Sequence, residues 1–306
     1  MALNLLQLVD QVTGEMGVQQ PSTVISNTTL YVIQLLNLAN GLGQNLSREH
    51  DWQGFDKEYR FTTVFYQYTA TTTSGSTSLT SLSSTTGLTS TPTYFQVTGT
   101  GINQDTYLVS VNGGGSSAVM TQAATASGTG VTLTFAQTLY ALPSDYDRLI
   151  DKTDWSKTQH WEMLGPETAQ EWQWLKSGYI SSGPRIRYRV LGGFFQIWPP
   201  QAANLYLGFE YMSNQWVTGA SGTGRSSMTI DTDVFTFPDP LMVTGLKWRW
   251  ATEKANNAEN EYKSAYMRQL DIAKANDAGS RTLNMAPRFT SVLIGFGNVP
   301  DSGYGT

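Results

Sequence analysis

Near the N-terminus, residues 4–16 place apolar side chains at the three- and four-residue steps of a helix. The apolar positions are Leu5, Leu8, Val9, Val12 and Met16. This spacing predicts a short amphipathic helix, and Gly17 and Pro21 end it.

A second helix is predicted from about residue 29 to Leu46, with Ser26, Asn27 and Thr28 as candidate N-caps. Its apolar positions at helical spacing are Leu30, Ile33, Leu36 and Leu42, and Val32, Leu35 and Leu38 widen the apolar stripe. No charged residue lies between Glu15 and Arg48. We therefore expect this helix to be buried on most of its circumference.

Residues 58–68 alternate apolar and polar positions, which predicts a strand. From Thr69 to Leu139 the only charged residue is Asp105. The Ser/Thr-rich opening, 69–91, is interpreted as a flexible lead, and period-two segments follow at 95–97, 107–111 and 131–135 with Gly-rich turns between them. This pattern predicts a small all-β module.

The C-terminal half mixes both periodicities. Strands are predicted at 186–190, 194–198 and 206–211, a short helix near 166–175, and a loop at 219–224. Asp239-Pro240 opens a helix expected to run to Asp277, unless Asn256-Asn257 breaks it into a hairpin. Beyond Ser280 the chain is Gly/Pro-punctuated, which predicts an extended arm that docks on a partner.

Composition narrows the class of protein. Of the 306 residues only 14% are charged, the formal net charge is −5, and cysteine is absent. The absence of cysteine excludes disulfides and Cys-based metal sites, and the acidic balance without a basic patch argues against a nucleic-acid binder. No basic segment precedes Leu5-Leu6 and no apolar run is long enough to span a bilayer, so we expect a soluble chain made in a cytoplasm.

Candidate catalytic groups are sparse. His50 and His160 are far apart in the sequence and no nucleophile motif accompanies them, so both are interpreted as surface or hydrogen-bonded side chains. Asp231 and Asp233 would point the same way on a strand and could form a glycosidase pair, but paired loop acids are more often solvated or capping. We therefore expect no enzyme activity, no cofactor and no metal.

Aromatic residues suggest interfaces instead. Nine tryptophans lie mostly in 155–174 and 198–250, and Trp and Tyr anchor interfaces as readily as they fill cores. A Trp-rich core therefore remains an equal alternative. The candidate interface residues are Trp248, Trp250, Tyr262 and Tyr266 of the last helix, and Arg281, Arg288, Phe289, Ile294 and Phe296 of the arm.

An ordered series of motifs runs through the C-terminal half. It reads Tyr140-Ala-Leu-Pro-Ser-Asp-Tyr-Asp-Arg-Leu-Ile150, Leu164-Gly-Pro166, Gln170-Glu-Trp-Gln-Trp-Leu-Lys176, Phe195-Gln-Ile-Trp-Pro199, Phe209-Glu-Tyr-Met-Ser-Asn214 and Leu241-Met-Val-Thr-Gly-Leu-Lys-Trp-Arg-Trp250. The series resembles the head–tail adaptor (connector) proteins of short-tailed bacteriophages, over residues 20–68 and 138–278. The usual pattern passes directly from the strand at 61–66 to the Tyr-x-Leu-Pro segment, so residues 69–137 are interpreted as an insertion.

The resemblance implies an α+β fold with three parts. An adaptor core, 1–68 and 138–279, would combine a helical bundle, a long C-terminal helix and a small antiparallel β part. Residues 69–137 would form an inserted Ig-like or small-sandwich domain, and 280–306 the arm.

It also implies a virion structural protein at the head–tail interface, present in the host cytoplasm before assembly. The protein would form a ring, expected to be dodecameric, that joins the portal protein to a tail nozzle or tail tubular protein. Genomic DNA would pass through without specific binding, and residues 69–137 would contact a glycan or a tail appendage. The alternatives are a carbohydrate-binding adhesin or tail-fibre component and, third, a glycosidase that uses Asp231 or Asp233.

Overall fold

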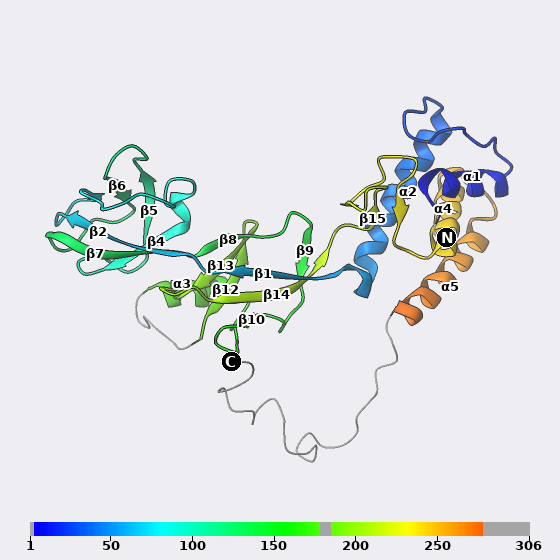
Figure 1. The fold of residues 1–306 in the computed structure, drawn as a ribbon. Helices are drawn as coiled ribbons and strands as arrows, with labels where there is room; N and C mark the ends of the chain where they lie inside the picture. The colour runs from blue at the N-terminus through cyan, green and yellow to red at the C-terminus, as the bar shows by residue number, and fades with distance from the viewer. Residues whose placement is uncertain (1–2, 178–184, 278–306) are drawn as a thin grey trace, which may run out of the picture. The chain divides into compact units, whose positions relative to one another are not determined.

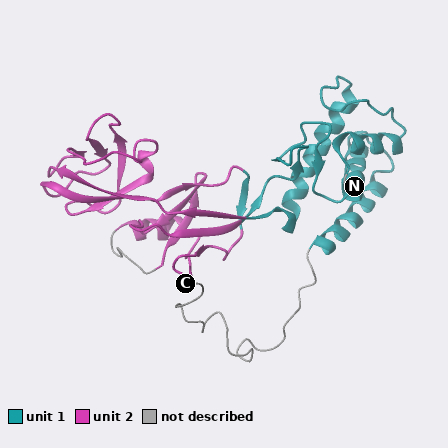
Figure 2. Ribbon diagram, viewed as in Figure 1, with its two compact units in different colours: residues 1–57, 145–149, 211–306 teal, residues 58–144, 150–210 magenta. Residues whose placement is uncertain are grey.

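The computed structural model describes residues 3–177 and 185–277. The chain is a mixed α+β protein whose described part contains five α-helices and several antiparallel sheets (Figure 1). It divides into two compact units, shown in Figure 2. Unit 1 contains residues 1–57, 145–149 and 211–306, and unit 2 contains residues 58–144 and 150–210.

Unit 1 holds four of the helices: α1 (Leu5–Glu15), α2 (Leu30–Glu49), α4 (Asp239–Glu253) and α5 (Glu259–Asp277). The predicted first helix is confirmed. Asn4 caps it by accepting a hydrogen bond from the backbone N–H of Gln7, whose side chain accepts one in return from the backbone N–H of Asn4. Its apolar face is fully buried, and α4 packs against α1, α2 and α5.

The second predicted helix also forms, but its burial is less complete than expected. Val32, Leu35, Ala39, Leu42 and Leu46 are buried on one face. Leu30 and Ile33 are 78% and 40% exposed. The expectation of burial on most of the circumference is therefore wrong. A helix without charged residues can be buried on every side, but in α2 the buried residues lie on one face.

The last predicted helix is interrupted. α4 ends at Glu253 and α5 begins at Glu259, so the unbroken helix does not form and the alternative break at Asn256-Asn257 is confirmed. Ala255 has a φ of 48°, outside the helical region. The Asn256 side chain then accepts a hydrogen bond from the Ala258 backbone N–H at 3.0 Å, which starts the new helix.

The short strands of unit 1 are β9 (Tyr146–Leu149), β15 (Val217–Thr218), β16 (Gly224–Arg225) and β17 (Val234–Phe235). β15 lies between β16 and β17 in a three-stranded sheet. The predicted loop at 219–224 is the turn between β15 and β16, closed by a hydrogen bond from Gly219 N to the Thr223 carbonyl. A single 3-10 turn, η1 (Gln53–Phe55), follows α2.

In unit 2 one sheet has the strand order β1-β14-β10-β11, and β9 pairs with the end of β14. Its strands are β1 (Asp56–Thr62), β14 (Tyr206–Ser213), β10 (Trp155–Ser156) and β11 (Trp161–Glu162). A second sheet, in the order β12-β13-β8, consists of β12 (Arg187–Leu191), β13 (Phe194–Trp198) and β8 (Leu139–Ala141). The strands predicted at 186–190, 194–198 and 206–211 are confirmed. Phe195 stacks on Tyr188 and Phe209, with ring centroids 4.9 and 4.8 Å apart.

The short helix α3 (Ala169–Lys176) is also confirmed, and its start is explained by a capping box. The side chain of Thr168 accepts from the Glu171 backbone N–H, and the Glu171 carboxylate accepts from the Thr168 backbone N–H. The helix begins at Ala169, three residues after the predicted start at 166.

Residues 65–137 form a six-stranded antiparallel sheet in the order β2-β7-β4-β5-β6-β3. The strands are β2 (Phe65–Thr72), β3 (Ser78–Leu79), β4 (Phe95–Gly99), β5 (Thr106–Val111), β6 (Ala118–Met120) and β7 (Gly128–Gln137), and the 3-10 turn η2 (Pro92–Tyr94) precedes β4. Reciprocal backbone hydrogen bonds between Thr71 and Thr80 join the two edges of this sheet. The sheet therefore closes on itself around one core, and the Ig-like or sandwich prediction is wrong.

The Ser/Thr-rich stretch 69–91 is part of this β module, which corrects the prediction of a flexible lead. Leu79, Leu82 and Leu88 are at most 5% exposed and belong to the module's buried cluster. The two ends of the module meet, because the Gln137 N–H donates to the Val64 carbonyl at 2.9 Å. That the module is an insertion stays a prediction.

Candidate interaction surface

The four predicted interface residues of the last helix lie in the α4–α5 hairpin of unit 1. Trp248 stacks on Tyr266, with ring centroids 5.1 Å apart and 27° between the planes. Lysine ammonium groups lie over the other rings, Lys247 over Tyr262 at 5.3 Å and Lys254 over Trp250 at 4.6 Å. These contacts join α4 to α5 or cover the hairpin itself.

Trp250 and Tyr266 are each 7% exposed, so both are buried within the single chain. Trp248 and Tyr262 are half-buried. The contact of these four side chains with a partner stays a prediction. The other predicted interface residues, Arg281, Arg288, Phe289, Ile294 and Phe296, lie outside the described residues, as does the whole arm from 280.

Exposed apolar side chains on two helices were missed by the sequence analysis. On α5, Met267 and Ile272 are 42% and 47% exposed among charged and amide neighbours. On α2, Leu30 and Ile33 form a similar pair at the N-terminal end. The signal was present on α5, where two large apolar residues, Met267 and Ile272, interrupt the polar surface of the helix.

Asp145 is the centre of a buried polar network beneath β9. Its carboxylate accepts hydrogen bonds from Lys57 at 2.6 Å, Ser213 at 2.8 Å and Tyr211 at 2.9 Å. Burial pushes its pKa upward, but the three donors and the Lys57 charge outweigh burial and hold the pKa below its usual value. Asp145 thus ties three segments of unit 1 together and does not face an open cleft.

Asp231 and Asp233 have structural roles. The Asp233 carboxylate is fully buried and accepts from the Arg225 guanidinium at 2.9 Å and from the backbone N–H of Thr229 and Ile230. The Asp231 carboxylate accepts from the backbone N–H of Val24 and Ile25. Each carboxylate therefore orders a loop, in agreement with the capping interpretation.

The two histidines lie in different units. His50 is 3.6 Å from an Asp277 carboxylate oxygen and packs edge-on against Trp52, while His160 is exposed in a turn between β10 and β11. Across residues 3–177 and 185–277, no group of three His, Asp or Glu side chains is placed to hold a metal ion. Over the same ranges, no helix has the length and hydropathy needed to cross a bilayer.

Comparison with known proteins gives one family. No curated protein matches the chain. The model of the SU10 adaptor protein family matches residues 107–288, which is more than half of the chain and includes α3, α4 and α5. The match begins inside β5, so it does not separate residues 69–137 from the rest of the chain. On this evidence the chain belongs to the SU10 adaptor protein family.

Proposed function

We propose that this protein is a structural component of a bacteriophage virion, a head–tail adaptor that forms a ring between the portal and the tail. The match of residues 107–288 to an adaptor family carries the proposal. In this function unit 1 supplies the helical bundle of the adaptor core, and no catalytic step is required of any residue.

The exposed side chains of α5 and α2 supply the ring contacts. When one face of a protomer binds a different face of the next, the copies form a closed ring if the rotation from one protomer to the next adds up to a full turn. Every protomer of the ring then makes the same two contacts. Met267 and Ile272 of one protomer would pack on a different face of the next, and we suggest the exposed end of α2 with Leu30 and Ile33. Apolar side chains surrounded by charged ones suit an interface with a buried centre and a polar rim.

The net charge of the chain and its C-terminal arm suggest the remaining partners, which are genomic DNA, the portal protein and a tail protein. A net charge of −5 suits a channel through which genomic DNA passes without specific binding. The arm, 280–306, would dock on the portal protein, and the opposite face of a dodecameric ring would receive the tail nozzle or tail tubular protein. The protein would reside in the virion after assembly in the host cytoplasm.

Reconstitution with portal rings of the same phage tests this function. We expect the full chain to co-sediment with portal rings in a fixed ratio and to appear as an added ring by cryo-electron microscopy. The double variant Met267→Ser/Ile272→Ser should bind in a reduced ratio, and the matched variant Ser264→Ala on the same helix should bind normally. A full chain that never co-sediments would contradict the adaptor function, and equal binding by all three proteins would place the ring contacts elsewhere.

Truncation after Gly279 tests whether the arm, residues 280–306, is needed for docking on the portal. We expect a folded chain that no longer joins portal rings, because each arm contact is weak and repetition around the ring multiplies it. Co-sedimentation at the full ratio would show that docking lies in the helices.

A further inference from the structure

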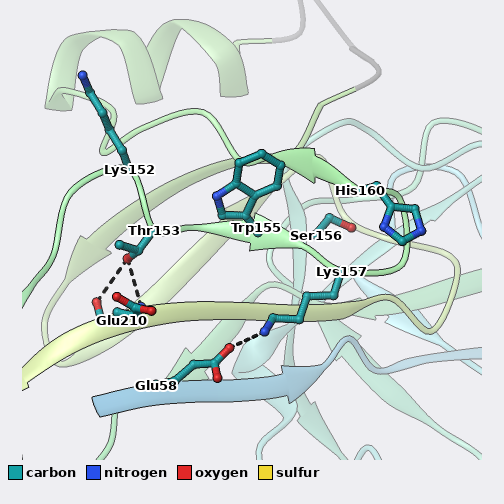
Figure 3. A pocket seen from close by; sticks show the side chains of 8 residues that line it. All are labelled: Glu58, Lys152, Thr153, Trp155, Ser156, Lys157, His160 and Glu210. Carbon is teal, nitrogen blue, oxygen red and sulfur yellow. Dashed lines mark hydrogen bonds and ion pairs between the residues drawn. The ribbon is translucent and has the colours of Figure 1, made fainter. Parts of the chain in front are cut away.

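A pocket of about 590 Å³ lies on the sheet of unit 2, whereas the helices that carry the proposed function belong to unit 1. Its walls are Glu58 of β1, Glu210 of β14, Trp155 to Lys157 on and after β10, and the turn residues Lys152, Thr153 and His160 (Figure 3). Its volume falls within the range of about 300–1,000 Å³ that is usual for small-molecule sites.

The aromatic wall of the pocket is Trp155 of β10. Trp155 and Gly208 are direct partners across the antiparallel pairing of β10 and β14. Position 208 carries no side chain, and the Lys157 side chain lies against it: a Cβ there would be 3.0 Å from Lys157 Cε and 3.4 Å from the Tyr59 carbonyl oxygen. Figure 3 shows the half-buried indole standing on the sheet, with Lys152 to one side and His160 to the other.

The charges of the pocket cancel. Glu58 is held between Arg60 and Lys157, and hydrogen bonds from these two cations lower its pKa to about 2. Glu58 and Lys157 therefore satisfy each other. Within residues 3–177 and 185–277, the carboxylate of Glu210 and the ammonium of Lys152 make no ion pair, so one acceptor and one donor remain for a ligand.

The indole face, the Glu210 carboxylate and the Lys152 ammonium group together indicate which class of ligand fits the pocket. A phosphate would need an excess of donors, and a guanidinium or ammonium would need an excess of carboxylates. An aromatic face with one acceptor and one donor beside it instead matches a sugar, whose C–H face packs on an aromatic ring while its edge hydroxyls both donate and accept. We propose that this pocket binds a neutral hexose-based glycan, with the sugar ring on Trp155 and its hydroxyls on Glu210 and Lys152.

Titration of the full chain with soluble oligosaccharides tests the proposal. The probes are maltohexaose, cellohexaose and hexa-N-acetylchitohexaose, with inorganic phosphate and a poly-arginine peptide as charged comparisons. Saturation-transfer NMR identifies binding, and calorimetry measures it. We expect at least one neutral oligosaccharide to bind at micromolar to millimolar concentration and to bind more tightly than either charged probe. Saturation by none of the three, or preferential binding of phosphate or of the peptide, overturns the proposal.

Variants assign binding to this pocket. Trp155→Ala should weaken binding at least tenfold, whereas Trp174→Ala removes an exposed tryptophan on α3, outside the pocket, and should leave binding unchanged. Because the first change could also disturb the sheet, Glu210→Gln removes only a charge from an exposed side chain and should weaken binding several-fold with unchanged thermal unfolding. Undiminished binding by both pocket variants would overturn the assignment. None of these measurements depends on ring assembly.

Discussion

Gly43 of α2 lies directly against the indole of Trp216, so that a Cβ at position 43 would be 2.2 Å from the Trp216 ring. Trp216 is 1% exposed, and its indole N–H donates to the Ser226 carbonyl at 2.8 Å. The ring can therefore neither move outward nor rotate without losing a hydrogen bond. A glycine in the middle of a helix, which usually costs stability, here allows the close packing of α2 on the β15 segment.

This contact predicts that Gly43→Ala destabilises the protein. Alanine favours the helix by about 1 kcal/mol, but overpacking of a rigid core costs about 1–3 kcal/mol and a severe overlap lies at the upper end. The matched control is Gly41→Ala on the same helix, where the new Cβ would meet only an Arg249 guanidinium nitrogen at 3.2 Å. We expect denaturant unfolding to show a loss for Gly43→Ala and no loss for Gly41→Ala; equal effects would contradict the packing argument.

Asp233→Asn should destabilise unit 1 by about 1–3 kcal/mol, because the amide oxygen can still accept from the backbone N–H of Thr229 and Ile230 but the amide NH2 then faces the Arg225 guanidinium, which loses its charged partner. Asp231→Asn is the control, since its oxygen can likewise accept from the Val24 and Ile25 N–H and, among the described residues, Asp231 forms no ion pair that the change would break. Thermal unfolding measures both. Normal stability of the Asp233 variant together with lost lytic activity on peptidoglycan would revive the glycosidase alternative.

The stability of unit 2 should fall between pH 5 and pH 7 because of Asp154. This carboxyl is 1% exposed, and burial raises its pKa to about 7, although the Tyr188 hydroxyl donates to it at 2.6 Å. Among the described residues, its other oxygen has no hydrogen-bond partner. In the unfolded chain this carboxyl loses its proton near pH 4, and in the folded chain only near pH 7. The free energy of unfolding is therefore highest below pH 4 and falls by a few kcal/mol as the pH rises to 7.

Thermal unfolding at pH 5, 6, 7 and 8 checks this dependence. Most other carboxyl groups are already ionised across that range. Asp154→Asn should flatten the decline, whereas Asp151→Asn, an exposed neighbour, should largely keep it. An equal slope in wild type and in Asp154→Asn would contradict the assignment.

Removal of the β module should leave a folded remainder if the cut respects the strand pairing. Gln137 N and Val64 O are 2.9 Å apart, so residues 65–136 can be replaced by a two-residue Asn-Gly turn. A cut that joins Tyr68 to Thr138 is the comparison, because it leaves half of β2 without its partner β7. We expect circular dichroism and thermal unfolding to show a cooperative transition for the first deletion and a weaker one for the second.

The module is not without contacts, so the first deletion should still cost some stability. Lys176 of α3 pairs with Asp105 of the module at 2.9 Å, and Tyr94 packs edge-on against Phe194 at 5.1 Å. Loss of all cooperative unfolding in the first deletion would show that the module belongs to the core of unit 2.

Local patterns determined much of the secondary structure. The apolar repeat of α1 and the period-two strands β4, β5, β7 and β13 depend on neighbours a few residues away, and each was predicted within a few residues of its observed limits. The break after α4 was available as an alternative because asparagine readily forms the turn that ends one helix and starts another. Composition misled at 69–91, where three separated leucines proved enough to anchor a Ser/Thr-rich segment in a core.

Long-range packing decided the rest. Sequence spacing could not tell a buried aromatic from an exposed one, and only the folded chain shows that Trp250 and Tyr266 are each 7% exposed. The α4–α5 turn brings Tyr266 onto Trp248. Nor could it separate a catalytic acid pair from two loop anchors, since the partners of Asp231 lie some 200 positions away in the chain. The pocket beside Trp155 likewise depends on the pairing that brings β1, β10 and β14 together from distant parts of the chain. Such relations arise only when distant segments pair, because solvent exposure, electrostatics and strand register belong to the folded chain and not to any window of its sequence.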